Sequence, residues 1–148
     1  MLDERYNVKT APDVESFEFD SVGPRGTIRK VVRYTEINLR NFYNLGFGDK
    51  DKMTGFISDL AITNNEDSQK VLATVAATLY AFTDTHPGAT IIATGSTETR
   101  IRLYRMGIAN NLEEIERDYE MLGLNADSEW EPFRKNATYS AFLVNRKS

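Results

Sequence analysis

The residue types best suited to chemistry in this sequence cluster where an apolar run, 89–94, gives way to a polar run rich in hydroxyls. This pattern predicts a strand followed by the start of a helix. The first turn of a helix has backbone N–H groups without partners inside the helix, and neighbouring hydroxyls and a cation make it suited to a phosphate or carboxylate. We therefore expect a candidate anion site formed by Gly95, Ser96, Thr97, Thr99 and Arg100.

The arginine of this site requires a negative partner. At about 100° per residue, Arg100 lies on the inward side of the predicted helix with Tyr104, whereas Arg102 lies on the opposite side. A cation in the first turn opposes the helix dipole, and its desolvation is costly unless an anion meets it. That anion is either a carboxylate of the chain, with Ser96 as a plain helix cap, or a bound ligand.

Few other residues are candidates for catalysis. The only histidine, His86, ends a predicted helix and is expected to cap or pack there; with Tyr104 it would be the proton-transfer group of an enzyme acting on an anionic or acyl-carrier ligand. The chain has no cysteine, and it has no phosphate-binding loop, dinucleotide motif or metal-ligand cluster. We therefore predict no cofactor and no metal, and favour a binding or interaction module.

The composition is that of an ordinary globular protein. The chain has 148 residues, of which 41% are hydrophobic and 27% charged, and this length predicts a single domain, 1–148. A net charge of −4 disfavours nonspecific binding to nucleic acid. Because the first residues lack a signal-peptide pattern and the longest nearly apolar run, 71–82, is too short for a bilayer, we expect a cytoplasmic protein without membrane association. A small anionic ligand or a protein partner is compatible with these features, and the oligomeric state is open.

A first hairpin is predicted near the N-terminus. Residues 17–20 alternate between phenylalanine and acid, 23–26 is a turn signal, and 27–37 is rich in β-branched residues. Arg29 and Arg33 share one parity of the second strand, so we expect them on a solvated face beside acidic neighbours.

A second hairpin is predicted from the runs 41–47 and 55–62. Asp49 and Asp51 lie in the polar turn between them. The glycine and the distant Glu of a calcium loop are missing, so we expect a solvated turn rather than a calcium site.

The strongest helix prediction covers 66–85, with a possible capping box formed by Thr63 and Glu66. Its spacing places one apolar stripe against the sheet. The residues of the stripe are Leu72, Val75, Leu79 and Phe82.

The remaining elements complete an α+β fold. A strand at 89–94 precedes a helix at 97–109, 124–137 is a loop, and 138–146 is a buried strand. Residues 115–123 fit either a helix or a strand, and we favour a short helical turn that leads into a strand. We predict an antiparallel β-sheet from the N-terminal hairpins, extended by the later strands, with two main helices packed on one face.

Three segments carry a resemblance to a known family: residues 95–105, Trp130-Glu-Pro-Phe133 and Tyr139-Ser-Ala-Phe-Leu-Val144. On these residues the chain resembles, over nearly its whole length, a family of small uncharacterised bacterial proteins classed as a domain of unknown function. The resemblance implies a cytosolic bacterial protein and no named activity. A looser likeness is to Gcn5-related acetyltransferases, in which a strand splays into a helix start that holds coenzyme A. The glycine-rich pyrophosphate loop of those enzymes is absent from this sequence.

Overall fold

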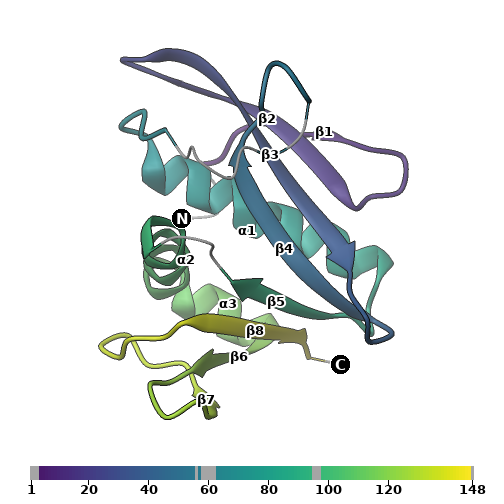
Figure 1. Cartoon of the computed structure of the whole chain (residues 1–148), viewed down its shortest axis with the longest axis vertical. Coiled ribbons are helices and arrows are strands. Elements are labelled where there is room, and N and C mark those ends of the chain that lie inside the picture. Colours follow the sequence, from purple (N-terminus) through teal and green to yellow (C-terminus); the bar gives the residue numbers. More distant parts are fainter. Residues whose placement is uncertain (1–3, 56, 58–62, 95–97, 148) are drawn as a thin grey trace.

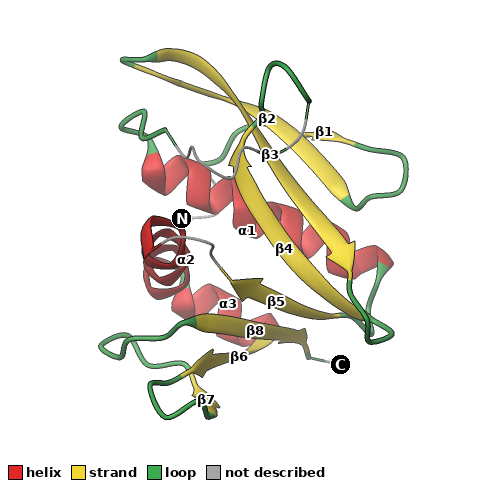
Figure 2. Ribbon diagram, viewed as in Figure 1, coloured by secondary structure: helices red, strands yellow, loops and turns green. Residues whose placement is uncertain are grey.

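A computed structural model describes residues 4–55, 57, 63–94 and 98–147 of the chain. In this part of the chain, eight strands form one sheet and three helices lie together on one of its sides (Figures 1 and 2). The order across the sheet is β1, β2, β3, β4, β5, β8, β6, β7. The strands are β1 (Lys9–Thr10), β2 (Ser16–Gly23), β3 (Gly26–Glu36), β4 (Phe42–Asp49), β5 (Thr90–Thr94), β6 (Tyr119–Leu124), β7 (Trp130–Pro132) and β8 (Ala141–Arg146), and the helices are α1 (Ser68–Thr85), α2 (Glu98–Asn110) and α3 (Leu112–Asp118).

The first hairpin is confirmed, because β2 and β3 pair antiparallel and are joined by the predicted turn. Strand β4 then pairs antiparallel with β3, so that Phe17, Val32 and Phe47 form one buried row across three strands. The second strand expected for the other hairpin, 55–62, lies mostly outside the described residues. Its described part forms a single bridge, between Ile57 and Lys50.

The sheet is not wholly antiparallel, which corrects the sequence-based prediction. Strands β4 and β5 pair parallel, because α1 carries the chain back along the sheet before β5 begins. The prediction of two main helices also omitted α3, although the short helical turn leading into a strand is confirmed by α3 and β6. The predicted loop 124–137 contains β7.

Helix α1 covers the centre of the sheet and supplies much of the core. The four residues of its predicted apolar stripe are all buried. The helix begins at Ser68, and the predicted capping box is wrong: the N–H of Thr63 donates to Asp49, and Glu66 has a positive φ of 60°. Both residues instead belong to a tight segment that leads into the helix.

The outer face of the N-terminal hairpin carries exposed ion pairs, as expected. Arg29 pairs with Glu18 at 2.9 Å and with Asp20 at 2.6 Å. Partial burial raises the pKa of Glu18, but hydrogen bonds from Arg29 and Lys50 outweigh it, and the pKa lies below its ordinary value. This face is a solvated surface rather than a free basic strip.

No helix in the described ranges is both long and apolar enough to cross a membrane.

Candidate ligand-binding site

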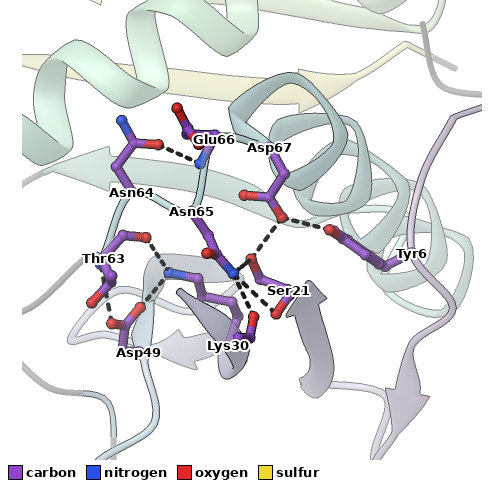
Figure 3. A network of polar contacts seen from close by, with 10 residues as sticks. Tyr6, Ser21, Lys30, Asp49, Thr63, Asn64, Asn65, Glu66 and Asp67 are labelled. Carbon is purple, nitrogen blue, oxygen red and sulfur yellow. Dashed lines mark hydrogen bonds and ion pairs between the residues drawn. The ribbon is translucent and has the colours of Figure 1, made fainter. Parts of the chain in front are cut away.

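A buried ion pair stands beside the start of α1. Lys30 on β3 is 1% exposed; its ammonium pairs with Asp49 and donates a hydrogen bond to the carbonyl of Thr63 at 2.9 Å (Figure 3). The register of β3 and β4 places Lys30 directly opposite Asp49, two residues along from the pair of Val32 and Phe47 and therefore on the same face. The expectation of a solvated turn at Asp49 is therefore wrong: this carboxylate is 8% exposed because it neutralises a buried cation.

Asn65 connects the segment before α1 to the β2–β3 turn. Its side chain is buried, its Nδ2 donates to the carbonyl of Gly26 at 2.8 Å, and its Oδ1 accepts from the N–H of Arg25 at 2.8 Å. One amide thus satisfies backbone groups on both sides of the turn. These bonds fix the position of the α1 start relative to the sheet.

Gly23→Ala is expected to disrupt this connection. A Cβ at Gly23 would lie 2.1 Å from the backbone oxygen of Asn65, so backbone rather than a flexible side chain would have to move. Overpacking of this kind costs about 1–3 kcal/mol of unfolding free energy. Urea unfolding of the variant tests this, with Gly88→Ala as the matched control because no atom lies within 4 Å of its added Cβ. Equal stability of the two variants would contradict the packing described.

Asp67, the N-cap residue of α1, binds side chains outside its helix. Its Oδ2 accepts hydrogen bonds from the hydroxyl of Tyr6 at 2.5 Å and from that of Ser21 at 2.6 Å (Figure 3). Burial and the hydrogen bond to Asp67 raise the pKa of Tyr6. Because Asp67 makes no side-chain cap bond, the first N–H groups of α1 are not used by this carboxylate.

A cavity of about 180 Å³ opens between this segment and α2. Its polar lining comes from both sides, and the helices also contribute an apolar wall. The polar lining includes Lys30, Asp67, Ser68, Thr99 and Arg102, and the apolar wall consists of Val71, Leu103 and Met106.

The predicted anion site is only partly within the described structure. Gly95, Ser96 and Thr97 lie outside the described residues. Thr99 is exposed and lines the cavity. Arg100 is 6% exposed, which confirms that it points inward.

Arg100 does not line the cavity but lies near Tyr104 in the core. Burial raises the pKa of Tyr104 to about 12, although the positive charge of Arg100 acts in the opposite direction. The phenol therefore keeps its proton at neutral pH. The arginine that lines the cavity is Arg102, which is exposed, as its outward position in the helical spacing predicts.

His86 lies at the far end of α1, which has 18 residues and is therefore about 27 Å long. Its ring stacks on Phe82 with a centroid distance of 4.3 Å, its Nδ1 lies 3.1 Å from the Phe82 carbonyl oxygen, and its Nε2 lies 3.4 Å from Glu15. The predicted packing and capping role is confirmed. His86 does not line the cavity that Thr99 lines.

Comparison with known proteins gives a family but no activity. A family model matches residues 2–147. The chain belongs to DUF6934, a family of unknown function. This confirms the predicted membership of a family without a named activity. Neither the curated proteins nor the solved structures include a match to the chain.

This DUF6934 chain also has a larger cavity, of about 550 Å³, beside α3. Two of its polar side chains have partners within the chain: Tyr80 donates to Asp118 at 2.8 Å, and Asn111 donates to the carbonyl of Gly107 at 2.8 Å. Within the described ranges, no group of three or more histidine, aspartate or glutamate side chains is placed to hold a metal ion. We take the smaller cavity as the candidate site, because Thr99 of the predicted anion site lines it and three apolar side chains form one of its walls.

Sequence reasoning missed the pair of Lys30 and Asp49, although the signal was present. Lys30 shares the inward parity of Val32 and Tyr34, and Asp49 shares that of Phe47. A charged residue at an inward position of each of two adjacent strands predicts a buried ion pair.

Proposed function

We propose that this protein is a binding module for a small ligand with an anionic group, held in the cavity between the first turns of α1 and α2. The observation that carries the proposal is the meeting of Arg102 and Thr99 with Ser68 around one cavity. A guanidinium, two hydroxyls and the start of an 18-residue helix are groups that favour a carboxylate or phosphate.

The charges around the cavity support this ligand class. Lys30 and Asp49 neutralise each other, so Lys30 offers hydrogen-bond donors but little net charge. The first turn of α1 contains no acidic residue, and the carboxylate of Asp67, which precedes this turn and lines the cavity, accepts from two hydroxyls with its Oδ2. Arg102 therefore supplies the positive charge that an incoming anion meets.

The cavity overlaps the predicted anion site only in part, since Arg100 does not line it. Thr99 belongs to both, and the contribution of Gly95, Ser96 and Thr97 stays a prediction. The alternative of an enzyme on an anionic or acyl-carrier ligand gains no support from Tyr104, which holds its proton, or from His86, which is remote. A bacterial origin and a cytoplasmic location likewise stay predictions.

Arg102→Gln is expected to weaken anion binding about tenfold or more, since a hydrogen bond to a charged group contributes about 1.5–3 kcal/mol. The measurement is an amide NMR titration with inorganic phosphate and with 4-methylpentanoate, following Ser68, Gln69 and Thr99. Arg117→Gln, which removes an exposed arginine of α3, is the control and should leave the affinity unchanged. The proposal fails if neither anion shifts these amides at millimolar concentration, or if both variants bind equally well.

A further inference from the structure

Asp67 lines the cavity, and its carboxylate has one acceptor atom without a partner in the described part of the chain. Its Oδ2 holds the hydroxyls of Tyr6 and Ser21, whereas its Oδ1 receives no hydrogen bond from the described part of the chain. Asp67 forms no ion pair with a described cation either, although the side chain is half-buried. The dipole of α1 offsets part of the cost of this charge, and a cationic donor in the cavity would offset more.

The other side of the cavity carries a positive charge. Arg102 of α2 makes no ion pair with a carboxylate of the described residues. Thr99, one turn earlier on the same helix, adds a hydroxyl at this side. The cavity thus has a carboxylate that can bind a cationic group on one side and a guanidinium that can bind an anionic group on the other.

The third feature is the apolar wall of Val71, Leu103 and Met106. Met106 is 40% exposed, so a ligand that covers it would remove apolar surface from water. A cavity of about 180 Å³ is smaller than the roughly 300–1,000 Å³ of pockets for drug-sized molecules. Its ligand is therefore of the size of a single small metabolite.

We propose that the cavity binds an α-amino acid with an apolar side chain. Its ammonium group donates to Asp67, its carboxylate accepts from Arg102 and Thr99, and its side chain lies against the apolar wall. A free phosphate satisfies only one of these three features and is repelled by Asp67. This assignment rests on the proposed function and narrows its ligand class.

The test compares three ligands of one shape on the unaltered protein: L-leucine, 4-methylpentanoate, which lacks the ammonium, and 3-methylbutylamine, which lacks the carboxylate. Leucine is expected to bind at least about tenfold more tightly than either, as one lost charged hydrogen bond predicts. Calorimetry, with the amides of Asp67 and Thr99 followed by NMR, gives the affinities and the place of binding.

The variant Asp67→Asn tests the contact with the ammonium group of the ligand separately from the contact with its carboxylate. The variant keeps an oxygen for Tyr6 and Ser21 and is expected to lose at least about tenfold in leucine affinity, while its affinity for 4-methylpentanoate is unchanged or higher. Arg102→Gln should weaken both. Equal affinity of the unaltered protein for leucine and 4-methylpentanoate would overturn the amino-acid assignment and leave the anion site standing. Absence of binding by every anion would remove both proposals.

Discussion

Asp49→Asn is expected to lower the free energy of unfolding by about 3–5 kcal/mol, because Lys30 then stays buried without its counter-charge. The amide keeps the shape of the carboxylate but not its acceptors. Asp49 accepts from Lys30 with one oxygen and from the N–H of Thr63 with the other, at 3.0 Å. An asparagine has one oxygen, so its NH₂ group must face one of these two donors.

Urea unfolding of three variants separates charge from shape in this pair. Asp51→Asn is the control, since Asp51 lies two residues away and serves a local turn, accepting from the N–H of Met53 at 2.7 Å. The double variant Lys30→Met with Asp49→Leu should recover most of the lost stability, as replacement of a buried ion pair by apolar residues is often neutral or stabilising. Equal losses in Asp49→Asn and Asp51→Asn would show that the pair is not the buried contact described.

Phe82→Ala is expected to cost about 3–5 kcal/mol, the usual range for removing a phenylalanine from a core. The side chain is fully buried and stacks on Tyr34 at a centroid distance of 4.3 Å, with the edge of Tyr43 at 4.9 Å. Its other contact is His86, which closes the end of α1. The substitution therefore opens a cavity where the helix, two strands and the histidine meet.

The matched control is Phe42→Ala, which removes the same side chain from a half-buried position on β4. Chemical denaturation should show a clearly smaller loss for this variant. The imidazole proton signals of His86 should also move in Phe82→Ala, because the ring current of the stacked phenyl group is gone. Similar losses of stability in the two variants would contradict the central position of Phe82 in the core.

The two stability predictions concern opposite ends of α1. The Lys30 and Asp49 pair fixes the segment that enters the helix, where the cavity lies, and Phe82 fixes its last turns. The start of the helix has many polar side chains and the end has an aromatic stack. Ligand binding is therefore expected to depend on Asp49 and to be less sensitive to Phe82.

Local periodicity in the sequence predicted several strands and the buried face of helix α1. Alternation along 17–20 and 27–37 follows from the opposite directions of successive strand side chains, and the stripe of α1 follows from the helical repeat. The same helical repeat correctly predicted that Arg100 points inward. These features need no knowledge of neighbouring elements, so the sequence by itself determined them, together with membership of the family.

The tertiary structure decided which residues meet. Parts of the chain that are far apart in sequence meet in three places: the parallel pairing of β4 and β5, the ion pair of Lys30 with Asp49, and the cavity that Arg102 and Asp67 both line. Outward spacing on the helix correctly predicts that Arg102 is exposed, but it could not show that this exposed side chain also lines a cavity with the α1 entry segment. Periodicity in the sequence predicts which way a side chain points from its own helix or strand. A binding site forms only where several helices and strands pack together.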